Sequence, residues 1–71
     1  MLRKHLIEAR GNQTQTHAAG EIGISQKHLS KLELGERTPT LVTAWRIAEY
    51  YEKPLEELFP DVLEKSRRKE N

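Results

Sequence analysis

The chain has 71 residues and a formal net charge of +1, with 32% of its residues charged, and this length suits one small domain. It contains no cysteine, which excludes disulfides and thiolate metal sites, and its three histidines are too scattered for a zinc site. No apolar run approaches the roughly 18 residues of a membrane span, and the N-terminus lacks the apolar stretch of a secretion signal. We therefore expect a cytoplasmic protein without a membrane segment, cofactor or metal.

The charges are distributed unevenly along the chain. Residues 1–48 carry seven lysines or arginines against four glutamates, a net charge of +3. Residues 49–63 carry five acidic residues against one lysine, a net charge of −4, and residues 64–71 carry a net charge of +2. A basic first part suits a protein that presents one face to a polyanion, although a small charged domain can also show such blocks by chance.

Apolar residues at helical spacing, together with capping residues, predict five helices. The expected helices cover residues 2–10, 15–22, 26–34, 41–51 and 54–58. Thr14, Ser25 and Thr40 stand before three of them, where a hydroxyl can accept a hydrogen bond from a first-turn amide. Pro60 could start a further turn. Residues 66–71 are predicted to form a disordered basic tail, which leaves residues 1–65 as the domain.

The expected helix at 41–51 has a continuous apolar stripe. Its members are Leu41, Ala44, Trp45, Ala48 and Tyr51, and Ile47 widens it. Because an indole buries more apolar area than any of the others, we expect Trp45 to make the largest single contribution to the core.

A glycine lies inside the expected helix at 15–22. Gly20 makes this helix less stable than alanine would, by up to about 1 kcal/mol. A close packing contact at this position, or a short helix, would explain why a glycine stands there.

The stretch from residue 15 to residue 34 reads QTHAAGEIGISQKHLSKLEL and contains two short helical patterns. Gly23 follows the first pattern, where the chain needs a residue tolerant of left-handed geometry. Ala19 and Gly23 are small where two helices that cross at about 90–120° must approach each other. The outward positions of the second helix carry Gln26, Lys27, Ser30 and Lys31. Such side chains suit hydrogen bonds to base edges and phosphates.

This window resembles the helix-turn-helix of the XRE family, the phage repressor and Cro-like DNA-binding domains. The matching residues include Gln15, Ala19, Gly23, Ile24, Leu29, Leu32 and Glu33. The likeness continues through residues 35–40, which read GERTPT, through Ile47 and Ala48, and through residues 55–59, which read LEELF. The resemblance covers residues 2–59 and implies an all-α, five-helix, lambda-repressor-like DNA-binding domain.

Two departures from the family pattern occur near the start of the window. The segment between Gly11 and Gln15 has one residue more than is usual, and Ala18 stands where the family usually has a leucine. We expect a longer loop there and a thinner core between the first two helices. In the family, the acid at Glu33 commonly pairs with an arginine of the first helix. The matching position here holds no arginine, and Arg3 or Arg10 could substitute.

The resemblance also implies roles for individual residues. The base-reading positions of the family fall on Gln26, Lys27, Ser30 and Lys31. Contacts to DNA phosphates are expected from Gln15 and Arg37, with His28 as a further candidate. The alternative interpretation for these side chains is a solvated helix face, and for His28 an ordinary surface histidine.

Function follows from the same resemblance. No glycine-rich phosphate loop follows a strand pattern, and no nucleophile has a base at motif spacing, so we expect no enzyme activity. We expect sequence-specific binding to double-stranded DNA by a homodimer that represses or autoregulates transcription. The alternatives are an antitoxin or restriction-modification controller-type regulator with a protein partner, and a protein-interaction module on the same fold.

A homodimer would need an apolar surface beyond what the first four helices bury. The expected interface consists of Leu55, Leu58, Phe59, Val62 and Leu63. A two-fold dimer would bind an inverted repeat with half-sites about 10 base pairs apart.

Overall fold

The computed structural model describes residues 2–62, and all regular structure in that range is helical. The helices are α1 (Lys4–Arg10), α2 (Gln15–Ile22), α3 (Gln26–Glu33), α4 (Leu41–Tyr51) and α5 (Leu55–Leu58). Residues 60–62 form a further helical turn. The five expected helices are confirmed, although α1 begins two residues later than predicted. The predicted interface residue Leu63 and the predicted tail, residues 66–71, lie outside the described part of the chain.

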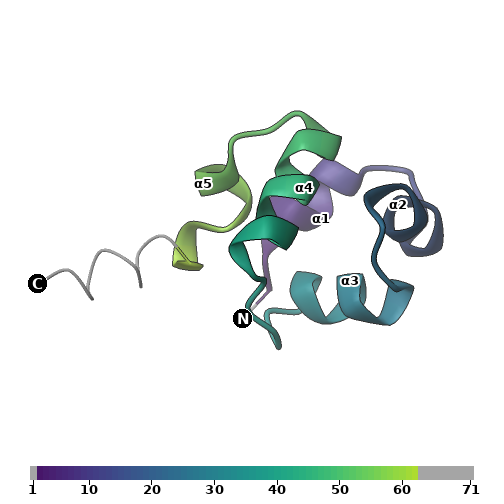
Figure 1. The fold of residues 1–71 in the computed structure, drawn as a ribbon, viewed down its shortest axis with the longest axis horizontal. Coiled ribbons are helices and arrows are strands. Elements are labelled where there is room, and N and C mark those ends of the chain that lie inside the picture. Colours follow the sequence, from purple (N-terminus) through teal and green to yellow (C-terminus); the bar gives the residue numbers. More distant parts are fainter. Residues whose placement is uncertain (1, 63–71) are drawn as a thin grey trace, which may run out of the picture.

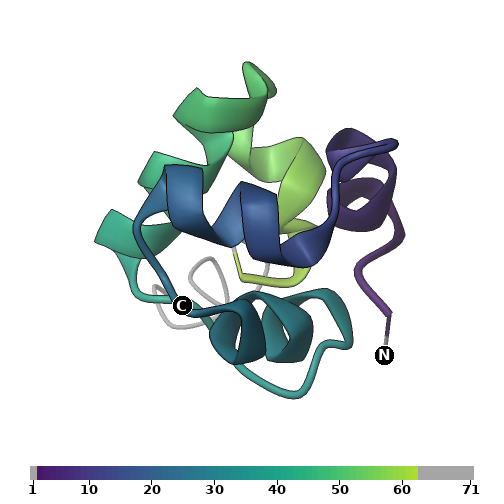
Figure 2. The same cartoon turned by 90° about the vertical axis from the view of Figure 1, so that its right-hand side faces the viewer.

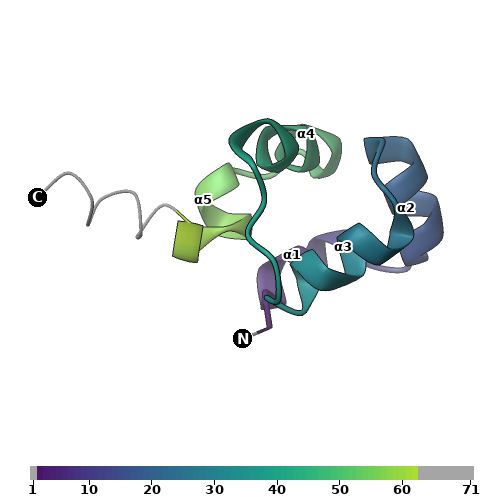
Figure 3. The same ribbon diagram turned by 60° about the horizontal axis from the view of Figure 1, so that its bottom comes forward.

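In Figure 1, α1 and α4 lie in the middle of the molecule, with α5 on one side and α2 and α3 on the other. α2 packs on α3 and α4, while α1 packs on α3 and α5, and α4 also packs on α5. Figure 2 shows α2, in blue, lying across one side of the molecule above α3, in teal. Figure 3 shows the connector, residues 34–40, running from the end of α3 to the start of α4. This arrangement leaves one long side of α3 uncovered.

Local hydrogen bonds fix where three of the helices start. The hydroxyls of Thr14, Ser25 and Thr40 each accept a hydrogen bond from the backbone N–H three residues on, at 3.0–3.1 Å. Gly23, between α2 and α3, has a φ of 97°, a left-handed conformation that disfavours side chains. These observations confirm the predicted caps and the predicted turn.

The core consists of two clusters of buried side chains. The smaller cluster joins α2 to α3 through Ala18, Ala19 and Leu29. The larger cluster contains Leu6, Ile22, Leu32, Ala44, Ile47, Leu58 and Phe59. Phe59 is the largest side chain that is fully buried. The aromatic centre of the core therefore comes from the segment after α5.

The prediction that Trp45 lies in the core is wrong. The Trp45 side chain is 59% exposed and Leu41, one turn earlier, is 71% exposed. The inward face of α4 instead consists of Ala44 and Ile47, which are 1% and 0% exposed. Ala44 and Ile47 both belong to the predicted stripe, and they pack in the same cluster as Phe59. The stripe is therefore broader than the buried face of α4, and its Leu41 and Trp45 side lies outside the core.

An arginine near the N-terminus joins three distant segments. Arg3 is 5% exposed, and its Nε and Nη2 donate to the two carboxylate oxygens of Asp61 at 3.2 and 2.9 Å. Its Nη1 donates to the backbone oxygens of Leu32 and Arg37 at 2.6 and 2.9 Å. The guanidinium also lies 5.4 Å from the centre of the Phe59 ring. Arg3 thereby holds the connector after α3 in place.

Candidate nucleic-acid interface

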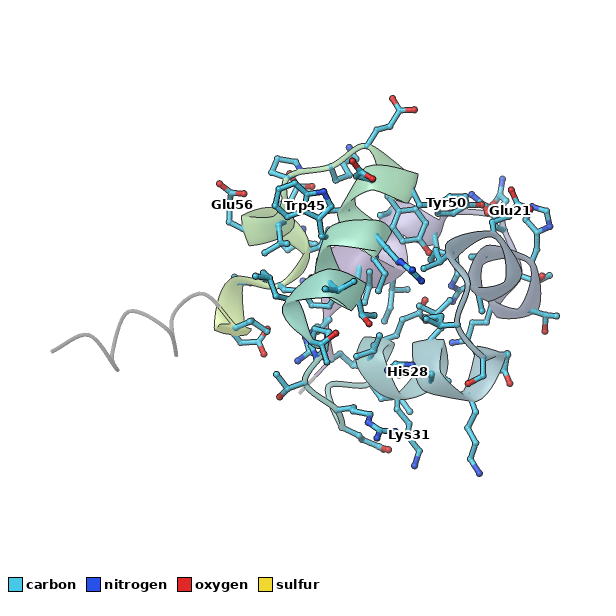
Figure 4. All side chains as sticks on the ribbon, in the orientation of Figure 1. Glu21, His28, Lys31, Trp45, Tyr50 and Glu56 are labelled. Carbon is cyan, nitrogen blue, oxygen red and sulfur yellow. The ribbon has the colours of Figure 1, made fainter. Side chains whose placement is uncertain are left out.

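The uncovered side of α3 carries the residues that were predicted to read bases. Gln26 and Lys27 are exposed, and Ser30 and Lys31 are half-buried. Lys31 points away from the body of the molecule, and His28 lies on the same helix (Figure 4). The Ser25 side chain caps the first turn of α3, and Gln26 and Lys27 stand in that turn. This geometry suits insertion of the N-terminal part of α3 into a major groove.

A chain of side-chain hydrogen bonds links α3 to α2 and α1. Gln26 Nε2 donates to Gln15 Oε1 at 2.7 Å, and Gln15 Nε2 donates to Glu33 Oε1 at 2.8 Å. Arg10 donates from Nε and Nη2 to the two Glu33 oxygens at 2.7 and 3.1 Å. The predicted pairing of Glu33 with an arginine is therefore confirmed for Arg10. The contact between Gln15 and Gln26 was not predicted.

Glu33 is the centre of this network and is 2% exposed. A buried carboxylate needs charged or polar partners, and Arg10 and Gln15 provide them. The hydrogen bond to Glu33 raises the pKa of Arg10, although burial opposes the change. Burial raises the pKa of Tyr51 to about 12, and the Glu33 charge adds to the increase. The Tyr51 hydroxyl is buried without a hydrogen-bond partner among residues 2–62.

The loop between α1 and α2 is anchored by the same arginine. Arg10 Nη1 donates to the backbone oxygen of Gln13 at 2.8 Å, and the Tyr50 hydroxyl donates to the Gln13 side chain. The Thr14 cap follows directly. This arrangement accommodates the extra residue that distinguishes the segment from the family pattern, and it sets the position of Gln15 at the first turn of α2.

The remaining residues predicted to contact phosphate are Arg37, which follows α3, and His28, which lies on α3. Arg37 is exposed on the connector, and Arg3 holds its backbone oxygen. His28 is half-buried on α3. The structure thus brings Gln15 against Gln26 and places Arg37 just beyond the other end of α3. The DNA contacts of these side chains stay predictions.

The predicted dimer residues do not form one exposed surface. Leu58 and Phe59 are 0% exposed and belong to the monomer core, so they have no surface left for a second copy. Leu55 and Val62 are half-buried and pack on that core. The large apolar side chains that are exposed on α4 are instead Leu41, Val42 and Trp45. Sequence reasoning assigned Leu41 and Trp45 to the core.

Other kinds of site find no support in the described residues. No three or more histidine, aspartate or glutamate side chains within residues 2–62 gather as metal ligands would. No helix in that range has both the length and the apolar character to cross a membrane.

In this all-α domain, a glycine turn joins the short helices α2 and α3, and α3 presents polar and basic side chains. This arrangement defines a helix-turn-helix DNA-binding domain. The family model described as helix-turn-helix matches residues 6–58, which is more than half of the chain, so the chain belongs to that family. This match confirms the resemblance to XRE-family regulators, which are not typically enzymes, and it supports sequence-specific binding to DNA. No curated protein and no solved structure matches the chain.

Proposed function

We propose that the protein is a transcriptional repressor or autoregulator that binds operator DNA as a homodimer, with α3 in the major groove. The observation that carries this proposal is the exposed start of α3. Gln26 and Lys27 stand there on a capped first turn, and Gln15 lies beside Gln26. A face with acidic side chains at these positions would have favoured a protein-interaction module instead.

The proposed base readers have complementary chemistry. A glutamine can form a bidentate pair with adenine, and a lysine can donate to the acceptors of guanine. Gln26 would read an adenine and Lys27 a guanine. Lys31 lies one turn further along the same helix, and Ser30 lies next to it, so the four side chains would cover one half-site.

The proposed phosphate contacts would set the orientation of α3. Gln15 stands in the first turn of α2, where backbone N–H groups and the helix dipole favour an anion. Only one of the two Gln15 Nε2 hydrogens is used by Glu33, so the other can donate to a phosphate. Arg37 would contact the backbone on the other side, and His28 would add a third contact.

The operator should show the symmetry of the protein. One recognition helix reads only a few base pairs, which is too few to locate a site in a genome. A two-fold dimer would double the readout and would bind an inverted repeat with half-sites about 10 base pairs apart.

Selection of bound sequences from a random duplex pool tests the proposal. We expect an inverted-repeat consensus. With about 6–10 phosphate contacts, affinity should fall roughly 10³–10⁵-fold between 50 and 200 mM salt. Lys27→Ala should change the consensus at one position in each half-site, whereas Arg37→Ala should weaken all sequences about equally. If the parent binds no duplex at low salt, the proposal is wrong and the fold serves as a protein-interaction module.

A further inference from the structure

The guanidinium of Arg3 lies between the end of α3, the connector and the turn at residues 60–62. All but one of its N–H groups donate hydrogen bonds. Two of these bonds go to the carboxylate of Asp61, and two go to the backbone oxygens of Leu32 and Arg37. The Arg3 side chain is 3% exposed, so it has almost no surface with which to contact DNA itself. Any effect of Arg3 on DNA binding must therefore be indirect.

The connector depends on this side chain for the position of Arg37. The hydrogen bonding that continues from α3 ends at the N–H of Glu36, and Pro39 is buried. Between these two points, the backbone of residues 37–39 makes one hydrogen bond to the described part of the chain, and its donor is Arg3 at 2.9 Å. Without that bond, Arg37 would be held only through its neighbours in the chain.

The carboxylate of Asp61 sets the direction in which the guanidinium points. Its two oxygens accept from Nε and Nη2 of Arg3 at 3.2 and 2.9 Å, and such a paired contact fixes the plane of the group. The ring of Phe59, 5.4 Å from the guanidinium, lies against it as well. With the plane fixed, Nη1 is directed at the connector and at the end of α3. Asp61 therefore acts on the connector through Arg3.

We propose that Arg3 is a positioning residue for DNA binding, which holds Arg37 where its side chain contacts a phosphate, with Asp61 as the anchor of Arg3. This inference rests on the proposed function, in which Arg37 contacts the DNA backbone. The connector follows α3 directly (Figure 3), so a shift of its backbone moves the Arg37 side chain relative to a duplex that α3 binds. A contact that is in place before binding costs less conformational entropy.

The helix α3 itself is held by other contacts. Leu32 is 0% exposed in the core, and the carboxylate of Glu33 is bound by Arg10. The backbone N–H of Arg3, which a change of side chain leaves in place, donates to the backbone oxygen of Glu33 at 2.9 Å. A change of the Arg3 side chain should therefore alter the phosphate contact of Arg37 and leave the base preference of α3 as it is.

The variant Arg3→Lys tests the proposal at constant net charge. The single nitrogen of a lysine cannot bind Asp61 and the connector in the geometry of a guanidinium. The variant should bind every duplex more weakly than the parent, by no more than Arg37→Ala does, and should select the same consensus. The slope of log affinity against log salt should become shallower by about 0.9 for each phosphate contact that is lost.

A double variant shows whether Arg3 acts through Arg37. The change Arg37→Ala removes the side chain that Arg3 positions and keeps the backbone oxygen that Arg3 binds. Adding Arg3→Lys to Arg37→Ala should therefore lower DNA affinity no further. If the two losses add, Arg3 acts independently of Arg37 and the proposal is overturned.

The variant Asp61→Asn separates positioning from overall charge. It makes the chain more basic, which by charge alone should strengthen binding to DNA. Its amide nitrogen carries hydrogens, so it cannot accept the second hydrogen bond from Arg3. If Asp61 anchors Arg3, the variant should bind DNA more weakly than the parent despite its additional positive charge. Stronger binding would contradict the proposal.

A core variant controls for a general loss of stability. Ile47→Val trims a side chain that is 0% exposed on α4, outside the connector, and should lower the thermal midpoint. All variants are compared at a temperature at which circular dichroism shows them folded. Ile47→Val should keep the DNA affinity and the salt slope of the parent. If it reproduces the effects of Arg3→Lys, those effects reflect stability and the proposal is wrong.

The order of the connector provides a measurement without DNA. By NMR relaxation, the order parameter of the Arg37 N–H should be about 0.85 in the parent and in Ile47→Val, and should fall toward about 0.6 in Arg3→Lys. An unchanged value would overturn the inference, because Arg3 would then not fix the connector.

Failure of this inference is distinguishable from failure of the proposed function. A parent that binds no duplex at low salt refutes the proposed function, and the DNA-binding role of Arg3 with it. A parent that binds DNA, together with an Arg3→Lys variant of the same affinity and salt slope, refutes this inference alone.

Discussion

The Nε2 of Gln26 donates a hydrogen bond to Oε1 of Gln15, 2.7 Å away, so a proposed base reader on α3 is held by a proposed phosphate contact on α2. Gln15 is itself fixed by the buried carboxylate of Glu33. The amide of Gln26 is thereby oriented before any DNA is present. Such preorganisation reduces the conformational entropy that binding would otherwise cost.

This relationship predicts that Gln15→Ala will affect specificity as well as affinity. Loss of the Gln15 oxygen frees the Gln26 side chain, so base preference should relax at the position that Gln26 reads, by about 1–3 kcal/mol per half-site. Gln26→Ala should relax the same position, and the double variant should lose less than the sum of the two. Selection from a random duplex pool measures all three.

The neighbouring residue provides a control for this experiment. Thr16 is exposed on the same turn of α2. Thr16→Ala should leave the selected base preference unchanged even if it lowers affinity. If Gln15→Ala selects the same DNA consensus as the parent, the hydrogen bond from Gln26 to Gln15 does not contribute to base preference.

Tyr51 predicts a dependence of stability on alkaline pH. Burial raises its pKa to about 12 in the folded chain, against about 10 in the unfolded chain. The neutral phenol is therefore favoured by folding. Its contribution to the free energy of unfolding is fully present below about pH 10 and is lost as the pH rises through 12.

The variant Tyr51→Phe isolates this contribution. Urea unfolding from pH 8 to pH 12 should show a smaller loss of stability for Tyr51→Phe than for the parent. At neutral pH the variant should be at least as stable, because it removes a buried hydroxyl that has no partner among the described residues. If the free energy of unfolding falls equally steeply with pH for the two proteins above pH 10, the pKa of Tyr51 is the same in the folded and the unfolded chain, and the prediction is wrong.

Gly20 predicts a stabilising substitution. It lies inside α2, and a methyl group built on its Cα would have no atom within 4 Å. The close contact that was one explanation for this glycine is therefore absent. Gly20→Ala should raise the free energy of unfolding by about 0.5–1 kcal/mol, since alanine loses less backbone entropy in a helix. Urea unfolding measures the change, and a destabilised variant would contradict it.

The features that sequence reasoning predicted depend on neighbours in the chain. The capping hydroxyls of Thr14, Ser25 and Thr40 bind amides only three residues away. The left-handed turn at Gly23 is equally local. Such patterns can be read without knowledge of the tertiary structure, and they were sufficient to predict the helices and the helix-turn-helix.

The features that it missed depend on distant parts of the chain. Arg3 and Asp61 are 58 residues apart in sequence, and nothing near either of them indicates the pair. The contact of Gln15 with Gln26 depends on the angle between α2 and α3. On α4, the predicted apolar stripe contained Ala44 and Ile47, which are buried, as well as Leu41 and Trp45, which are exposed. Helical spacing shows that these residues lie near one another on the helix, but the edge of the buried face depends on which other helices pack there.

The last prediction compares Phe59, which was predicted to lie in a dimer interface and lies in the core, with Trp45, which was predicted to lie in the core and is exposed. Phe59 is 0% exposed at the centre of the larger cluster, so Phe59→Ala should leave a cavity and cost about 3–5 kcal/mol. At roughly 0.05–0.15 kcal/mol per residue, a chain of 71 residues has a total stability of about 4–11 kcal/mol, so this variant should lose a large share of it. Trp45→Ala removes a side chain that is 59% exposed and should change stability far less. Thermal unfolding of the parent and both variants at one chain concentration compares the two. A larger loss for Trp45→Ala than for Phe59→Ala would contradict the inward face assigned to α4.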